Sequence, residues 1–312
     1  MANIRDIAKA ANVSVTTVSR VLNDHPYVSE EKRRAVLETM KVLKYNKNLN
    51  AVTLSKGKTQ IIGVVLPYIH QPFFSLVLNG IARRASEEGK TIMLFQTNYE
   101  EEKEREALEK LKGKQLDGLI FCSRALSQAD IQMYGQHGPV VLCEESEHMN
   151  CVYMNHYESI VTGVRHLRRR GYERIGLTLN RNSGRNTNER VRALKDSGFH
   201  DEDIFYGALN MEDGEEIARE LLLLGNDGPD ALIITNDTVA AGIYNEFRRR
   251  GKKIPDDLAL LSYDNQHIAQ SLEISSVQLP LLEMGEAAYS LLSIPKHKKI
   301  ELPFTLIQRE ST

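Results

Sequence analysis

The chain has 312 residues, of which 41% are hydrophobic and 26% are charged, as in a folded globular protein of two or three domains. No run of about 18 apolar residues occurs, and charges interrupt the N-terminal segment where a signal peptide requires an apolar core. We therefore expect a cytoplasmic protein that does not span a membrane. The net charge is −2, yet the first sixty residues hold eleven Lys and Arg against five Asp and Glu. This basic segment predicts contact with a polyanion.

The first three expected elements are short helices. Apolar side chains recur over residues 4–11 at the spacing of one helical face. Ser14 is a favourable N-cap for a second helix that begins at Val15, although the Val and Thr residues there favour strands. A third helix is expected from residue 30 to about residue 43, with acidic residues in its first turn to suit the helix dipole. Three such helices predict a helix-turn-helix unit over residues 1–45.

The second helix has a polar face that suits DNA. In a helix-turn-helix unit, the N-terminal residues of this helix enter the major groove. Val15 and the Thr methyl groups can meet thymine methyl groups, and Arg20 can bind O6 and N7 of guanine. The alternative is a solvated face on an unrelated three-helix domain. The residues expected to contact DNA are Ser14, Val15, Thr16, Thr17, Ser19, Arg20 and Asn23.

Residues 46–58 are polar and basic and are expected to link the head to the rest of the chain. They form either a flexible linker or one or two helical turns, with Leu49 and Leu54 as the large apolar side chains. A helix this short is unstable alone in water and requires a partner.

From residue 61 onward, short apolar runs alternate with amphipathic helical segments. This rhythm predicts parallel sheets covered by helices on both faces. The runs are too many for one compact sheet, and a break near residues 150–157 predicts two lobes. The apolar runs are 61–67, 91–98, 117–123, 139–143, 174–180, 204–209, 230–237 and 258–264.

Polar and aromatic residues follow several of these runs. Ligands of open α/β sheets bind beyond the carboxyl ends of the strands. Aromatic rings together with Arg, Asn and Asp suit a small polar ligand such as a sugar. Each residue alone could equally form a turn or cap a helix. The segments that follow the strands contain residues 68–74, Ser123, Arg124, Glu144, Glu145, Arg190, Asn236, Asp237, Asp264 and Asn265.

Cofactor chemistry and catalysis have little support. Cys122, Cys143 and Cys151 are an odd number without C-x-x-C spacing, so we expect buried thiols rather than disulfides or a zinc site. The chain contains no G-x-G-x-x-G, P-loop, G-x-S-x-G or H-E-x-x-H motif. We expect neither an enzyme nor a bound metal or cofactor.

Three segments together resemble one family of bacterial repressors. The head reads IRDIAKAANVSVTTVSRVLN, then VSEEKRRAVLETMKVLKYN, and the body begins SKGKTQIIGVVLP. These segments resemble the LacI–GalR family, and the resemblance extends over essentially the whole chain. It implies an α/β fold, with a three-helix helix-turn-helix domain followed by a two-lobed domain like the type I periplasmic binding proteins. The implied ranges are head 1–45, hinge 46–58, and effector-binding and dimerisation domain 59–312, with an N-lobe of about 59–156 plus part of 281–300 and a C-lobe of about 157–280 plus the C-terminal strand.

The resemblance also assigns roles to residues. Residues 46–58 would be a hinge helix, and Leu54 stands where the family inserts a leucine into the minor groove. Lys47 and Val52 depart from the usual proline and arginine of this hinge, and Cys143 and Glu144 stand where Asp-Arg is common. HQPFFS, NERVRAL, TND and SYDN match family effector motifs. The implied effector residues are Gln71, Phe73, Phe74, Ser123, Glu144, Arg190, Asn236 and Asp264.

The expected function is therefore a transcriptional repressor. It would bind pseudo-palindromic double-stranded operator DNA as a homodimer, under the control of a small-molecule effector, such as a sugar, between the lobes. One alternative is control by a phosphocarrier protein that docks on the segment ARRASEEGK. A more remote alternative is a ligand-binding protein without a DNA role.

Overall fold

The structure is a computed structural model that describes residues 3–22, 25–45 and 57–312. The chain divides into two compact units, residues 1–59 and residues 60–312, and each is described by itself. In the described part of the chain, no helix has the length and the apolar character that are needed to cross a membrane.

The head consists of three helices, as the sequence predicted. They are α1 (Ile4–Ala10), α2 (Val15–Leu22) and α3 (Glu30–Val42). Ser14 caps α2, since its Oγ accepts a hydrogen bond of 3.1 Å from the backbone N–H of Thr17. Packing overrides the strand propensity of α2, because Val18 and Val21 are buried against Ile7 of α1 and Val36 of α3.

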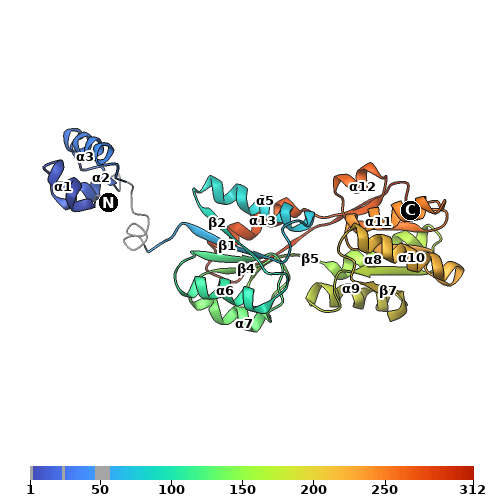
Figure 1. The fold of residues 1–312 in the computed structure, drawn as a ribbon. Helices are drawn as coiled ribbons and strands as arrows, with labels where there is room; N and C mark the ends of the chain where they lie inside the picture. The colour runs from blue at the N-terminus through green and yellow to red at the C-terminus, as the bar shows by residue number, and fades with distance from the viewer. Residues whose placement is uncertain (1–2, 23–24, 46–56) are drawn as a thin grey trace. The chain divides into compact units, whose positions relative to one another are not determined.

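The N-lobe contains a parallel six-stranded sheet in the order β11-β5-β4-β3-β1-β2 (Figure 1). Its strands are nearly continuous apolar runs because helices cover both faces. On one face α5 and α13 pack against Val64 and Leu66, and on the other α6 packs against Val65. The elements are β1 (Ile61–Leu66), α5 (Pro72–Glu87), β2 (Thr91–Gln96), α6 (Glu101–Lys112), β3 (Gly118–Phe121), α7 (Gln128–Gln132), β4 (Val140–Leu142), β5 (Asn150–Met154), α13 (Leu281–Leu291) and β11 (Lys299–Leu302).

The C-lobe repeats this plan in the order β12-β10-β9-β8-β6-β7, and only β12 runs antiparallel to its neighbour. One buried cluster joins α8 and α9 to the sheet, and a second joins α10 and α11 to its other face. The elements are α8 (His156–Arg169), β6 (Ile175–Leu179), α9 (Arg185–Asp196), β7 (Ile204–Tyr206), α10 (Met211–Leu224), β8 (Ala231–Ile234), α11 (Asp237–Arg249), β9 (Ala259–Asp264), α12 (His267–Ser271), β10 (Ser275–Gln278) and β12 (Thr305–Ile307).

The chain passes between the lobes three times. It enters the C-lobe after β5, returns to the N-lobe at α13, and crosses again between β11 and β12. The return is tightly packed at Gly285 of α13, where an added Cβ would lie 2.0 Å from the backbone oxygen of Val77 in α5. The hydrophobic pattern missed β5, β10, β11 and β12, which have only three to five residues each. In particular, β5 occupies the start of the segment in which we expected a break.

Candidate functional site

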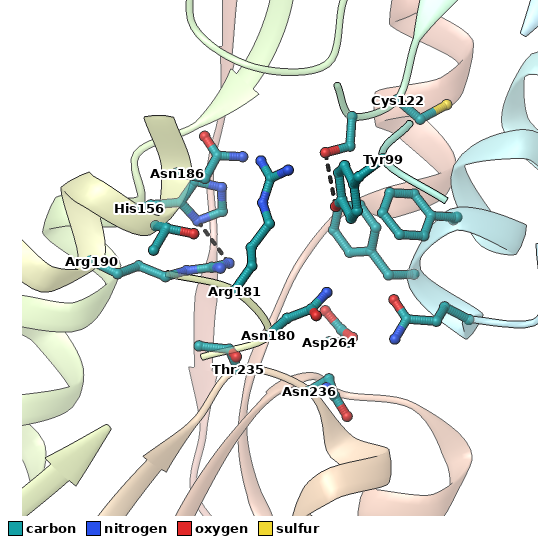
Figure 2. A pocket seen from close by; sticks show the side chains of 15 residues that line it. Tyr99, Cys122, His156, Asn180, Arg181, Asn186, Arg190, Thr235, Asn236 and Asp264 are labelled. Atoms are coloured by element: carbon teal, nitrogen blue, oxygen red, sulfur yellow. Dashed lines mark hydrogen bonds between the residues drawn. The ribbon is translucent and has the colours of Figure 1, made fainter. Parts of the chain in front are cut away.

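A pocket lies between the two lobes, beyond the carboxyl ends of strands from both sheets (Figure 2). Its volume is about 110 Å³, which is small beside the roughly 300–1,000 Å³ of ligand sites in general and fits a compact ligand. Seven of the eight residues expected to bind an effector line it. They are Gln71, Phe73, Phe74, Ser123, Arg190, Asn236 and Asp264.

The eighth expected residue, Glu144, does not line the pocket. Its carboxylate is buried in the N-lobe and pairs with the guanidinium of Arg124. The same carboxylate accepts a hydrogen bond of 2.9 Å from Nε2 of Gln128. The charge of Glu144 is thus compensated within the N-lobe, and the structure assigns its carboxylate to this ion pair.

Eight further residues, none of them in the expected set, also line the pocket. Asn180 and Arg181 directly follow β6, so the strand-end rule could have identified both. His156 begins α8 after a crossing between the lobes, and no pattern in the sequence marks it. The additional lining residues are Tyr99, Cys122, His156, Asn180, Arg181, Asn186, Thr187 and Thr235.

Arg190 projects from α9 into the pocket wall. Its Nη2 lies 3.3 Å from Nδ1 of His156, and its guanidinium carbon lies 5.9 Å from the centre of the Tyr263 ring. Burial, reinforced by the charge of Arg190, holds the pKa of His156 well below its usual value, so this histidine is neutral and its Nδ1 can accept the hydrogen bond. Burial also lowers the pKa of Arg190.

Arg181 crosses from the C-lobe to the N-lobe. Its guanidinium carbon lies 4.0 Å from the centre of the Tyr99 ring, and its Nη1 donates to the backbone oxygen of Arg124 at 3.1 Å. The Tyr99 hydroxyl in turn lies 3.1 Å from Oγ of Ser123 (Figure 2). This chain of contacts fixes the direction of Arg181.

Asp264, which lines the pocket, and Asp237 are buried acidic residues whose charges interact. Burial raises the pKa of Asp264 well above its usual value, and the neighbouring charge of Asp237 adds to the rise. Burial raises the pKa of Asp237 to about 6, even though Ser262, Ser276 and the backbone N–H of Gln266 donate hydrogen bonds to it. The raised pKa favours the protonated form of Asp264, and Nε2 of Gln266 donates a hydrogen bond of 3.1 Å to its carboxyl group. Its φ of 93° is unusual for a residue other than glycine, a form of backbone strain that concentrates at binding sites.

Two further contacts join the lobes beside the pocket. Nε2 of Gln71 donates to the backbone oxygen of Leu209 at 3.0 Å, and Arg185 of α9 pairs with Glu145 of the N-lobe. Asn236 both lines the pocket and caps α11, since its Oδ1 accepts from the N–H of Val239 at 2.8 Å. The described residues contain no group of three His, Cys, Asp or Glu that could hold a metal ion, and all three cysteines are buried and unpaired.

The polar face of α2 is accessible in the head. Ser14, Val15, Thr16 and Arg20 are exposed, whereas Thr17 and Ser19 are half-buried. The side chains of Ser14 and Thr17 lie 2.9 Å apart and hydrogen-bond to each other at the start of the helix. Two residues of the expected DNA-binding set, Asn23 and Leu54, lie outside the described residues.

A helix-turn-helix head joined to a two-lobed domain with an interlobe pocket defines the class of ligand-responsive DNA-binding regulators. Residues 3–48 match the family described as bacterial regulatory proteins, lacI family. Residues 59–307 match the periplasmic binding proteins and sugar binding domain of LacI family. The chain belongs to the LacI family, and it is a DNA-binding transcriptional regulator with an effector-binding domain, not an enzyme.

Individual relatives agree with this assignment. The chain is 40% identical over 324 residues to the uncharacterized HTH-type transcriptional regulator YkvZ of Bacillus subtilis (strain 168), covering 100% of both chains. Its structure is similar to the lac repressor dimer bound to operator and an anti-inducer, with a TM-score of 0.84, 22% identity and coverage of 99% and 98%. It is also similar to the transcriptional regulator CelR in complex with cellobiose, with a TM-score of 0.71, 24% identity and coverage of 100% of both chains.

Proposed function

We propose that this regulator is a homodimeric repressor whose affinity for a pseudo-palindromic operator depends on a small carbohydrate bound between the lobes. The observation that carries the proposal is the composition of the pocket. Rings from the N-lobe, including Phe73 and Tyr99, face amides and charged groups from the C-lobe, including Asn180 and Arg190. Rings suit the apolar faces of a sugar, and amides and guanidinium groups suit its hydroxyls. The cellobiose complex of a protein with the same fold supports this ligand class.

The pocket supports control of DNA binding because both lobes contribute to it. A ligand that contacts both walls favours the interlobe arrangement in which those contacts form. The segment 46–58 joins the head to the N-lobe, so a change between the lobes of two subunits alters the spacing of the two heads. Coupling of this kind is typically worth about 1–3 kcal/mol.

Control by a phosphocarrier protein has weaker support. The segment proposed for docking ends α5, and its two arginines already have acidic partners. Arg83 pairs with Glu286 at 3.2 Å, and Arg84 pairs with Glu87 at 2.6 Å. Both arginines at the end of this helix are therefore already neutralised by carboxylates of the same chain, and the small-molecule proposal has the stronger support.

Fluorescence anisotropy tests the DNA-binding part of the proposal. Duplexes selected by the full-length protein from a random library should contain an inverted repeat, because two heads bind two half-sites. Arg20→Ala should relax the preference at one base pair of each half-site at a cost of about 1–3 kcal/mol. Arg192→Ala, an exposed C-lobe arginine, is the control with the same loss of charge. Equal, steeply salt-dependent affinity for selected and scrambled duplexes would contradict sequence-specific binding.

A further inference from the structure

The pocket carries more positive charge than a neutral sugar requires. Two guanidinium groups line it, Arg181 and Arg190, and the only carboxyl group among its lining residues is that of Asp264. In the described part of the chain, neither arginine forms an ion pair. Their polar partners are instead the backbone oxygen of Arg124 and the neutral ring of His156.

The acidic groups near the pocket form ion pairs with residues other than Arg181 and Arg190. Glu144 pairs with Arg124 inside the N-lobe, and Glu145 pairs with Arg185 and with Lys299. Among the described residues, no carboxylate forms an ion pair with either pocket arginine, and the carboxyl group whose charge acts on Arg190 is that of Asp264, whose own pKa is raised. Buried or half-buried charges without a partner are costly, so the arrangement favours a ligand that supplies the missing charge.

Arg190 has one hydrogen-bond donor that is not satisfied. Its Nε is buried and has no hydrogen-bond partner among the described residues. An unsatisfied buried donor destabilises the folded protein, and more so when the group is charged. A guanidinium group presents its donors in a planar fork that matches the oxygens of a phosphate or carboxylate.

The N-terminus of α9 adds a further attraction for anions. Gly184 occupies the N-cap position, where no side chain caps the helix, and the first turn contains no acidic residue. Asn186 and Thr187, the second and third residues of this 12-residue helix, both line the pocket. The free N–H groups and the dipole at such a terminus favour negative charge.

We propose that the effector carries an anionic group, a phosphate or a carboxylate, which binds between Arg181, Arg190 and the start of α9. This inference rests on the proposed function, because it describes the ligand of the same pocket. Arg181 is the residue that distinguishes an anion site from a site for hydroxyls alone. Its stacking on Tyr99 holds the guanidinium in place before a ligand arrives (Figure 2).

The state of Asp264 agrees with an anionic ligand. Burial and the neighbouring charge of Asp237 raise the pKa of Asp264 well above its usual value, which disfavours a negative charge on Asp264 beside a bound anion. A neutral carboxyl group can stand beside a bound anion without repelling it and can donate a hydrogen bond to it.

Inorganic phosphate tests the proposal without knowledge of the complete ligand. We expect phosphate to stabilise the full-length protein against heat relative to chloride at equal ionic strength. At tenfold the dissociation constant the rise in melting temperature should be about 3 °C. The rise should disappear in Arg181→Gln. It should persist in Arg192→Gln, which removes the same charge from an exposed position on α9, and in part in Arg181→Lys, which keeps the charge.

Two outcomes would overturn the proposal: the absence of a phosphate-dependent rise in the wild-type protein, or an equal rise in wild type and Arg181→Gln. If Arg181→Gln is too unstable to compare, Arg181→Lys replaces it. The anion-site proposal is overturned if phosphate raises the melting temperature of Arg181→Lys as much as that of the wild type, while chloride and phosphate stabilise Arg192→Gln equally. Acetate in place of phosphate separates the two sources of charge. A larger rise with phosphate identifies a phosphoryl group, and a larger rise with acetate identifies a carboxylate.

The test is independent of the proposed regulation. A protein that binds its selected operator but shows no response to anions refutes the anion site and leaves the repressor proposal intact. A protein that responds to anions through Arg181 but binds no specific duplex refutes the repressor proposal and leaves the anion site intact.

Discussion

The two walls of the pocket differ in how they treat charge. In the N-lobe the ionic groups near the pocket pair with each other behind its surface, as Glu144 does with Arg124, and the wall that faces a ligand consists of rings and small polar groups. On the C-lobe wall, Arg181 and Arg190 face the cavity without ion-pair partners among the described residues. Charged residues thus stabilise the N-lobe by pairing with each other, whereas in the C-lobe two arginines remain available to bind a ligand.

The largest effect on stability is expected at the ion pair between Glu144 and Arg124, which lies behind the N-lobe wall. Glu144→Gln leaves the guanidinium of Arg124, which is only 13% exposed, without its counter-ion, which should reduce the free energy of unfolding by about 3–5 kcal/mol. Urea denaturation measures the change. Glu145→Gln breaks a more exposed pair and should cost less than about 1 kcal/mol. Equal losses in the two variants would show that the burial of the Glu144 pair has no special role.

The next effect depends on pH and belongs to the acidic pair of the C-lobe. Because the pKa of Asp237 is raised to about 6 in the folded state, the folded protein holds this proton more tightly than the unfolded chain does. Its contribution to stability is therefore greatest below about pH 4 and declines by on the order of 2–3 kcal/mol as pH rises through 6. Asp237→Asn should remove this decline, which denaturation at pH 4.5 and pH 7 would reveal. An unchanged pH dependence in the variant would contradict the assignment.

Arg190→Gln should affect the C-lobe wall in the opposite sense from Glu144→Gln. The change removes a buried charge that has no counter-ion, while glutamine can still donate to His156. We expect stability to remain equal or to rise by about 1–2 kcal/mol, together with loss of the response to phosphate. Parallel urea and thermal-shift measurements separate the two effects. A loss of stability as large as that of Glu144→Gln would mean that both walls are built for stability.

The smallest effect is expected at the ring that supports Arg181. Tyr99→Phe removes the hydrogen bond with Ser123 but keeps the ring beneath the guanidinium, so the response to phosphate should change by less than about 1 kcal/mol. Tyr99→Leu removes the aromatic face and should weaken phosphate binding by about 0.5–2 kcal/mol. Phosphate titrations of both variants provide the comparison, and an equal response in the two would exclude a role for the ring.

Much of the fold was accessible from the sequence because burial leaves a strong pattern in it. The helix expected from residue 30 to about residue 43 spans Glu30–Val42 in the structure, and five of the six residues of the strand Ile61–Leu66 are buried. Strands β5 and β11 were missed because their pairing joins distant segments, with Cys151 opposite Lys299. Length alone does not explain the omission, because the expected strand β4 has only three residues; polar residues interrupt the apolar runs of β5 (NCVYM) and β11 (KIEL).

The pocket was accessible in part for a similar reason. Residues that directly follow strands, such as Ser123 and Asn236, could be selected by rule, and the structure brings them to one cavity. Glu144 follows a strand too, but an internal partner, Arg124, removes it from the pocket wall. Which charges are compensated depends on contacts between segments, and a single sequence does not contain those distances. His156 joins the site only because a crossing between the lobes places the start of α8 there.

The most direct test of the account is whether occupation of the pocket alters operator affinity. Carbohydrates and their phosphorylated or carboxylated forms would first be screened for stabilisation of the wild type but not of Arg190→Gln. Each compound selected in this way would then be added to an anisotropy titration of the selected operator. We expect a change in operator affinity of about 5- to 150-fold that is lost in Arg190→Gln. Compounds that bind through Arg190 and leave operator affinity unchanged would contradict it.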